Sequence, residues 1–277
     1  MGRAMTRMRR NDWAAFLALC LGAVAMFGPF VWLLSTSLKP MAEQFDMRLL
    51  PQQPTLGNYT RLFEIMPFHL LIWNSLKISL ISTLGQLLTC SMAAFMFAIV
   101  RFPGRNILFA LLLVTLMVPA QVTAIPQFII FKTIGLYGTQ APLYIPSFLG
   151  GAFGTFLMRQ YFRTIPLELA EAARMDGASL ARIFFTIYLP LAKPALAAFA
   201  IIAFMVSWND LFSALIYLPS DVDKTTLTVG LALFQQQYSG HWTLMMAASI
   251  ISMAPVVIAF FMAQKQFVAG MAMTGFK

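Results

Sequence analysis

The sequence predicts an all-α, polytopic membrane protein with about six transmembrane helices. Of its 277 residues, 60% are hydrophobic and only 10% are charged, and the mean hydropathy is +0.77. Soluble domains carry about a quarter charged residues. Apolar stretches of about 20 residues, the length that crosses a bilayer, recur along the chain. The net charge of +9 does not indicate nucleic-acid binding, because no soluble basic run with interleaved aromatic residues occurs.

The six predicted spans lie at about 13–34, 73–100, 107–131, 141–157, 191–218 and 243–263. The first follows a cluster of arginines, as a signal peptide does, but its apolar run is long enough to predict an uncleaved span. Pro119 and Pro126 interrupt the third span, which membrane helices tolerate where neighbours satisfy the freed carbonyls. The polar, proline-broken segment 35–67 predicts a loop with short helices, and 219–242 a second polar loop.

These segments predict three parts of the chain. Residues 1–68 hold the first span and an extracytoplasmic loop, residues 69–265 hold the core, and residues 266–277 form a cytoplasmic tail. With the N-terminus inside, most of the 19 basic residues fall on the cytoplasmic side. Basic residues gather there in membrane proteins. The chain is therefore expected to be a multi-pass protein of a bacterial cytoplasmic (inner) membrane, in contact with lipid, with both termini cytoplasmic.

The segment 159–194 is the longest charged passage, and it predicts a cytoplasmic helical hairpin inside the core. Pro166 suits the first position of a helix, and Gly177 can end that helix in the left-handed conformation. Ser179 can cap the second helix. Such a hairpin can dock to a soluble protein or lie on lipid. Docking is favoured, because the first helix is acidic and has no wide apolar face.

The hairpin carries a recognisable pattern, Glu171-Ala172-Ala173, then Gly177, then Ile187 and Leu189-Pro190. This pattern resembles the EAA loop of ABC importer permeases. Resemblance to the carbohydrate branch, similar to the smaller permease of maltose-type importers, covers nearly the whole chain. It is carried by Thr55 to Tyr59, Met117 to Gln121, Ile125-Pro126, Trp208-Asn209-Asp210 and Phe267 to Gly270. The resemblance implies a type I ABC importer permease fold, and a transport subunit rather than an enzyme.

The resemblance also implies the partners. They are a second homologous permease, two ATP-binding subunits and an extracytoplasmic solute-binding protein that delivers a sugar. ATP and Mg²⁺ belong to the ATP-binding subunits, and this chain, which lacks a phosphate-binding loop, is expected to carry no cofactor. No catalytic or metal site is expected either, since His69 and His241 stand alone.

In the resembled family the hairpin sits in a groove of the ATP-binding subunit and transmits its closure. The residues predicted to couple the chain to that ATPase are Glu171, Ala172, Ala173, Arg174, Asp176, Gly177, Arg182, Leu189 and Pro190. Arg174 and Arg182 are candidates for ion pairs with the partner, and simple solvation of both side chains is an equal alternative. Thr274 and Gly275 resemble a family tail that reaches between the ATP-binding subunits, although short tails are often disordered.

Trp208-Asn209-Asp210 is predicted to lie inside the fifth span, toward its outer half. An ionisable group in a span usually faces a cavity or a partner, so these residues are candidates for lining the sugar path. The alternative is hydrogen bonding between helices. Two other functions stay open: an ion-coupled secondary transporter, for which only Asp210 qualifies, and a glycerol-phosphate importer. A glycerol-phosphate importer is expected to have basic residues deep in its spans, whereas Lys77 lies near the end of the predicted second span.

Overall fold

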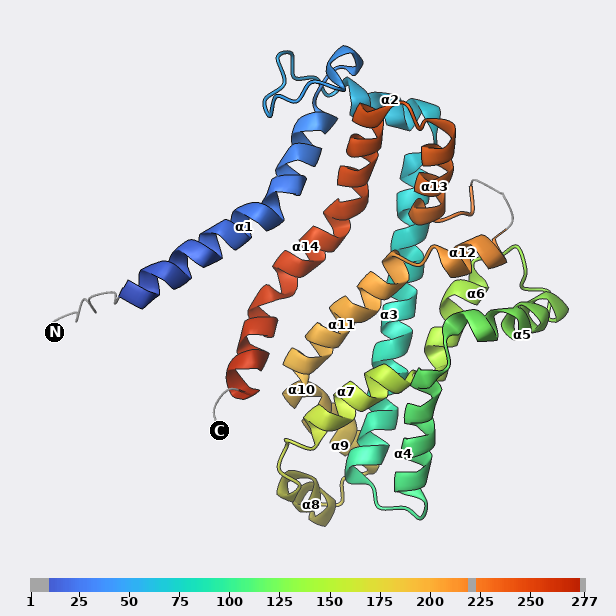
Figure 1. Ribbon diagram of the computed structural model, residues 1–277. Coiled ribbons are helices and arrows are strands. Elements are labelled where there is room, and N and C mark those ends of the chain that lie inside the picture. The colour runs from blue at the N-terminus through green and yellow to red at the C-terminus, as the bar shows by residue number, and fades with distance from the viewer. Residues whose placement is uncertain (1–9, 219–222, 275–277) are drawn as a thin grey trace. The chain divides into compact units, whose positions relative to one another are not determined.

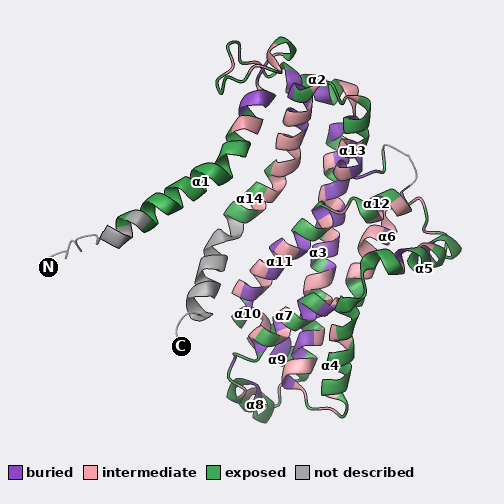
Figure 2. Cartoon of the chain, viewed as in Figure 1, coloured by how far each residue is buried: buried purple, intermediate pink, exposed green. Residues whose placement is uncertain are grey.

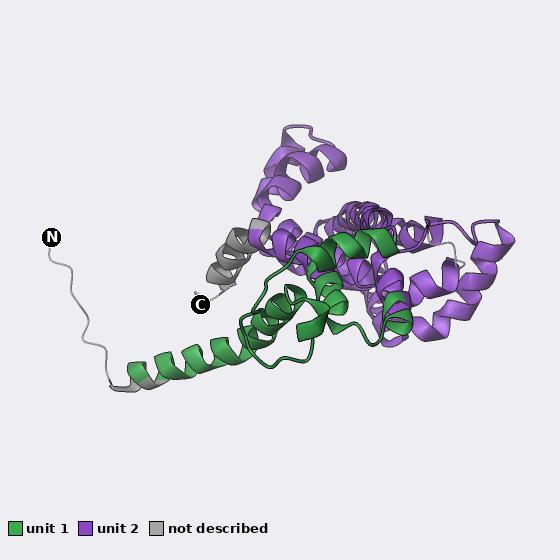
Figure 3. Cartoon of the chain, turned by 90° about the horizontal axis from the view of Figure 1, so that it is seen from above, with its two compact units in different colours: residues 1–66, 234–251 green, residues 67–233, 252–277 purple. Residues whose placement is uncertain are grey.

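The computed structural model describes residues 10–218 and 223–274, and the regular elements of this part of the chain are all helical (Figure 1). Four helices are long and apolar enough to cross a membrane, or up to six when each of two bent pairs counts as one span. The predicted all-α membrane fold is therefore confirmed. The chain divides into two compact units, residues 1–66 with 234–251 and residues 67–233 with 252–277 (Figure 3).

The first unit begins with α1 (Arg10–Ser37) and continues through a loop with two short helices, a 3₁₀ turn (Met41–Glu43) and α2 (Gly57–Ile65). The apolar side chains of α1 are exposed along most of its length (Figure 2), as a helix in contact with lipid requires. Asn58 of α2 donates its amide to the carbonyls of Ser37 and Lys39, both at 2.8 Å. These two bonds satisfy carbonyls at the end of α1 that the helix itself leaves without partners.

The second unit is organised around α3 (Phe68–Ile99), which packs against α7 (Ala152–Phe162) and α11 (Lys193–Trp208). Helices α7 and α11 approach each other closely at Gly154. A Cβ atom added there would lie 2.0 Å from the ring of Phe199. Only glycine therefore fits at this crossing, where small residues let membrane helices pack closely.

The third span is interrupted at Pro119, as predicted, and the structure bends it by 98° between two helices. Helix α4 (Arg105–Val114) leads into a 3₁₀ turn (Thr115–Met117), and α5 (Ala120–Thr133) follows Pro119. Proline has no N–H to continue the helix and drives the preceding residue into an extended conformation. Val118 has that conformation, with φ −86° and ψ 114°.

The other predicted spans and loops differ from the structure mainly at their ends. The fourth span consists of α6 (Ala141–Tyr144), a 3₁₀ turn (Ile145–Leu149) and α7. The predicted fifth span is broken, since α11 ends at Trp208 and α12 (Phe212–Tyr217) follows. The second polar loop contains a helix, α13 (Leu227–Gln237). The sixth span, α14 (Trp242–Thr274), runs beyond its predicted end.

Candidate functional site: the charged hairpin

The predicted hairpin forms at one end of the second unit, from α8 (Glu168–Met175) and α9 (Leu180–Ile183) (Figure 1). A π turn (Phe184–Tyr188) and α10 (Leu189–Leu191) continue the second arm toward α11. Pro166 is not the first residue of α8 as predicted. It lies two residues earlier, in the turn after α7, where its carbonyl accepts a hydrogen bond from the Leu169 N–H at 3.4 Å.

Gly177 ends α8 in the way predicted from the sequence. Its φ is +76°, in the left-handed region that favours glycine. The N–H of Gly177 donates to the Arg174 carbonyl at 3.0 Å, and the N–H of Ala178 donates to the Ala173 carbonyl at 2.9 Å. This pair of bonds defines a Schellman motif, which fixes the direction in which the chain leaves α8.

Ser179 then caps α9, also as predicted. Its Oγ accepts a hydrogen bond from the Arg182 N–H at 3.3 Å. At the far end of the second arm the chain turns by 81° between Leu191 and Lys193, so Leu189 and Pro190 lie in the last turn before the corner. Ala192 at this corner is fully buried, which leaves no room for a larger side chain without a shift of the packing.

The inner face of the hairpin is apolar and packs against α3 and α7. Ala170 of α8 and Ile183 of α9 are fully buried in the same core cluster. The ring of Tyr188 packs edge-on against Phe162 of α7, with ring centroids 5.5 Å apart, and against Phe95 of α3, at 5.2 Å. The hairpin is thereby held to two membrane helices through an interlocked aromatic group.

The outer face of the hairpin is exposed and carries both charged and apolar side chains. Most of the predicted coupling residues lie on it, namely Glu171, Ala172, Arg174, Asp176, Gly177, Arg182 and Pro190, while Ala173 and Leu189 are half-buried. No charged side chain of α8 or α9 forms an ion pair with another described residue. Apolar side chains also protrude, Leu169 with 43% and Met175 with 88% exposure on α8, and Leu180 with 40% and Phe185 with 56% on the second arm. Together these residues make a surface of charged and apolar groups.

Leu169 and Met175 were not among the residues predicted to take part in docking. Each lies three residues from Ala172, so each is a neighbour of Ala172 on the helix surface. The contribution of Tyr188 could not be read in this way, because it depends on rings from Phe95 and Phe162, which are distant in the sequence.

The Trp208-Asn209-Asp210 motif lies at the end of a helix, not inside a continuous span as predicted. Trp208 is buried, and its Nε1 donates to the Ser252 carbonyl of α14 at 3.1 Å. This is the hydrogen bonding between helices that was the alternative for the motif. Asp210 accepts the Ser213 N–H at 3.0 Å and so caps α12. Asn209 is exposed, and a role of the motif in the sugar path stays a prediction.

The predicted tail contact falls at the edge of the described chain. Thr274 is the last residue of α14, and Gly275 lies outside the described residues. Within the described part, no group of three or more His, Cys, Asp or Glu side chains is placed to hold a metal ion.

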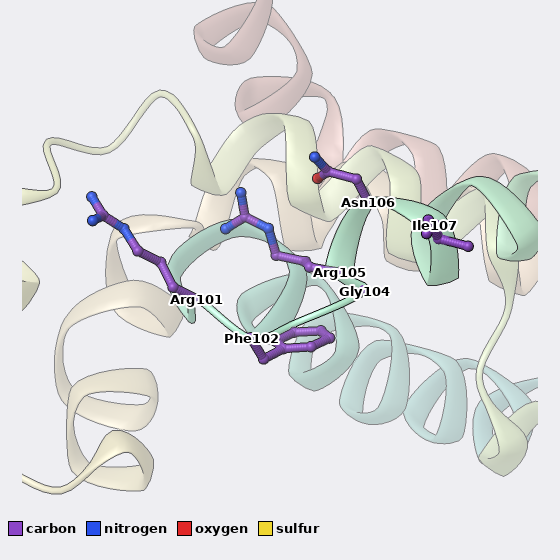
Figure 4. Close-up of a pocket in the computed structure, with 6 residues that line it drawn as sticks. All are labelled: Arg101, Phe102, Gly104, Arg105, Asn106 and Ile107. Atoms are coloured by element: carbon purple, nitrogen blue, oxygen red, sulfur yellow. The ribbon is translucent and has the colours of Figure 1, made fainter.

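A basic hollow lies beside the turn between α3 and α4, with a volume of about 320 Å³. Figure 4 shows the side chains that line it, among them Arg101, Phe102 and Arg105. Arg105 donates to the Val100 carbonyl at 3.3 Å, which fixes one of the two guanidinium groups.

Comparison with known proteins agrees with this architecture. Residues 86–272 match the family described as binding-protein-dependent transport system inner membrane component. The chain is 32% identical over 269 residues to the lactose transport system permease protein LacG of Rhizobium radiobacter, covering 96% of this chain and 98% of LacG. It is 34% identical over 268 residues to the arabinooligosaccharides transport system permease protein AraQ of Halalkalibacterium halodurans, covering 95% and 94%.

A solved structure of another protein has a similar fold. It is a chain of a bacterial ABC transporter involved in the import of the acidic polysaccharide alginate. That chain is 27% identical, the TM-score is 0.81, and the match covers 93% of this chain and 98% of the other. The fold is therefore that of an ABC importer permease, as the resemblance of the EAA pattern implied. The chain belongs to the family of binding-protein-dependent transport system inner membrane components, and its role is transport rather than catalysis.

Proposed function

We propose that this chain is the permease subunit of an ABC importer that carries a saccharide into the cytoplasm. The named relatives support this proposal, since LacG and AraQ are permeases for lactose and for arabinooligosaccharides. The chain aligns with both over nearly its whole length, so the likeness is not confined to one motif. Which saccharide it carries is not fixed by these relatives, because their substrates differ from one another.

The outer face of the hairpin is the observation that carries the proposal. A helix that buries Ala170 and yet exposes charged groups beside Met175, at 88% exposure, leaves apolar and charged surface without a partner inside the chain. Exposed apolar groups rimmed by polar ones are typical of protein interaction sites. The occupant we propose is an ATP-binding subunit, with Glu171, Arg174 and Arg182 available for ion pairs across the interface.

The remaining subunits and the orientation follow as parts of the same proposal. The core of this chain provides half of a pathway, so a second homologous permease completes it. A solute-binding protein delivers the saccharide on the extracytoplasmic side, and two ATP-binding subunits hold ATP and Mg²⁺. In this proposal the hairpin and both termini lie in the cytoplasm, and Thr274 and Gly275 contact the ATP-binding subunits.

The route from the hairpin to the membrane helices runs through packed side chains. When the ATP-binding subunits close, they displace α8, and the buried aromatic group of Phe95, Phe162 and Tyr188 transmits the shift to α3 and α7. The corner at Ala192 transmits it to α11. Packed interiors resist gradual deformation, so the helices move between two arrangements. Switching fully between them requires ATP to favour one state by about 5 kcal/mol.

The proposal is tested by recovering the tagged chain from its own membranes in a mild detergent and identifying its partners by mass. An ATP-binding subunit and a second permease are expected. Met175→Asp should lose the ATP-binding subunit, because the substitution places a charge where an apolar contact is proposed. Met47→Asp is the matched control, since Met47 is a methionine of similar exposure, 84%, in the loop before α2.

Two results would contradict the proposal. If the wild-type chain is recovered alone in a detergent that preserves such complexes, an ion-driven transporter becomes the better interpretation. If Met175→Asp retains the ATP-binding subunit as well as Met47→Asp does, the hairpin is not the docking surface.

A further inference from the structure

The basic hollow beside the turn between α3 and α4 is lined by positive charge and by no carboxylate. Its lining consists of Arg101, Phe102, Gly104, Arg105, Asn106 and Ile107. In Figure 4 the guanidinium groups of Arg101 and Arg105 and the amide of Asn106 extend from the same side of the turn. Guanidinium groups bind phosphate through pairs of hydrogen bonds. The hollow is therefore suited to an anion with several oxygen acceptors.

Two further arginines add positive charge close to the hollow. Arg159 of α7 interacts electrostatically with Arg105 and with Arg163. Arg159 is itself held in place, since its Nε donates to the Phe97 carbonyl at 3.2 Å and its guanidinium group lies 4.0 Å from the centroid of the Phe109 ring. None of the four arginines forms an ion pair with another described residue. Like charges repel one another, so an anion bound among them lowers the electrostatic energy.

The turn lies at the edge of the apolar layer, because the helices on both sides of it are apolar. Helix α3 alone is long and apolar enough to cross a membrane, and α4 begins one of the two bent pairs that satisfy the same test. The chain leaves the apolar layer after Ile99, the last residue of α3, and enters it again at Ile107. Phospholipid headgroups occupy this zone on both sides of a bilayer, so the argument does not depend on which side the turn faces.

An exposed apolar stripe leads from the hollow along α4. Ile107, Leu111 and Val114 follow the i, i+4, i+7 spacing of one helix face and are 68%, 58% and 54% exposed. Because Ile107 also lines the hollow, the charged and the apolar surfaces are continuous. A soluble phosphate satisfies the arginines alone, whereas a ligand with a phosphate group and long acyl chains contacts both surfaces.

The charge of the lining also discriminates among phospholipids. A choline headgroup brings a quaternary ammonium group close to the arginines, and the lining has no carboxylate to receive it. An anionic headgroup that carries hydroxyl groups brings no such cation. Its hydroxyl groups can bond with the amide of Asn106, which is exposed and makes no side-chain hydrogen bond with another described residue. An amide both donates and accepts.

We propose that the hollow binds an anionic phospholipid, with the phosphate on Arg101 and Arg105 and a headgroup hydroxyl on Asn106. The acyl chains lie along the apolar stripe of α4. The chain thus holds one lipid of defined charge against a membrane helix, and this property is independent of the saccharide import proposed above.

The test titrates the full-length protein, purified in a mild detergent with the subunits that it retains, with dioleoyl phosphatidylglycerol. Native mass spectrometry measures the affinity of the tightest lipid. The double variant Arg101→Gln with Arg105→Gln should weaken it about thirtyfold, which corresponds to about 2 kcal/mol, or about 1 kcal/mol for each basic residue. Arg101→Gln alone, which removes no hydrogen bond within the described chain, should weaken it about fivefold.

Two further double variants serve as controls. Arg101→Lys with Arg105→Lys should retain most of the affinity, because lysine also binds phosphate. Arg48→Gln with Arg61→Gln should leave the affinity unchanged, since it removes two exposed arginines from the other compact unit. Two comparison ligands identify the chemistry that is bound. Dioleoyl phosphatidylcholine should bind more weakly than phosphatidylglycerol, and glycerophosphoglycerol, the headgroup without acyl chains, should not displace the lipid.

Three results would overturn the inference. The first is equal affinity for phosphatidylcholine and phosphatidylglycerol in the wild type. The second is an equal effect of the Arg101 and Arg105 pair and the Arg48 and Arg61 pair of glutamine substitutions. The third is displacement of the lipid by glycerophosphoglycerol as effectively as by phosphatidylglycerol itself, which would assign the arginines to a soluble phosphate.

Discussion

The ring of Tyr188 in the second arm of the hairpin lies edge-on to the ring of Phe95 in α3, with centroids 5.2 Å apart and planes at 68°. The ring centroid of Phe184 lies 5.4 Å from that of Phe95. Aromatic pairs in this geometry contribute about 0.5–1.5 kcal/mol beyond the burial of their area. The contact therefore holds the hairpin to α3 through the packing of aromatic rings rather than through charge.

The hydroxyl of Tyr188 yields the first prediction. It is buried and has no hydrogen-bond partner among the described residues. Tyr188→Phe should therefore keep the ring contacts and raise the free energy of unfolding, by up to about 1 kcal/mol. Tyr188→Ala should lower it by about 3–5 kcal/mol, because the ring leaves a cavity. Denaturation midpoints of the purified chain in one detergent measure both. A Phe variant as unstable as the Ala variant would mean that the hydroxyl has a partner.

Gly177 tests the link between hairpin geometry and transport. Gly177→Asp puts a side chain at φ +76° and a negative charge on the proposed docking surface, so saccharide uptake should be abolished while the protein remains in the membrane. Gly135→Asp is the control, because Gly135 has φ +75° and equally open surroundings but ends α5. It carries the same backbone strain and should retain uptake. Unchanged transport in Gly177→Asp would remove the coupling role.

Trp208 is expected to stabilise the packing of α11 against α14. Trp208→Phe loses the bond from Nε1 to the Ser252 carbonyl and part of the stack on Phe204, whose ring centroid lies 5.6 Å away. The free energy of unfolding should fall by about 1–3 kcal/mol. Trp73→Phe is the comparison, since Trp73 is 59% exposed, and its effect should stay within about 0.5 kcal/mol. Similar effects of the two variants would contradict the packing role.

The stability of the protein is expected to depend slightly on pH through Asp46, which lies in the loop before α2. The Arg48 backbone N–H donates to its carboxylate at 3.0 Å and lowers the pKa of Asp46 below the usual 3.8. A lowered pKa in the folded state means that the stabilisation is present above pH 3.8 and is lost as the pH falls through the folded-state pKa. The stability difference between wild type and Asp46→Ala, followed by thermal unfolding from pH 6 to pH 3, should shrink toward acid. A difference that grows instead would contradict the assignment.

Much of the fold follows from the sequence, because length and hydropathy alone define most spans. The hairpin follows as well, since a Schellman glycine at 177 and a capping serine at 179 are local devices whose chemistry depends on a few neighbouring residues. The break of the third span at Pro119 was visible as a proline but not as a bend of 98°. Its angle depends on what the two halves pack against.

The parts that could not be predicted depend on residues distant in the sequence. Helix α3 begins at Phe68, five residues before the predicted start of the second span, because its polar start, with His69 and Asn74, lowers the mean hydropathy there. Asn74 donates to carbonyls of the segment before α13, 149 and 151 residues away. Hydropathy carries no information on such pairings, so these contacts became visible only in three dimensions.

The two faces of α8 have a consequence for how such transporters diversify. The buried positions, Ala170 and the aromatic rings below it, belong to the chain's own architecture, whereas Glu171, Arg174 and Met175 face outward and contribute little to it. Exposed positions can change with small effects on stability. Because we propose that this outer face contacts an ATP-binding subunit, substitutions there are expected to change which ATP-binding subunit the permease binds, at little cost in stability. Exchange of these three side chains is the smallest change expected to alter that pairing.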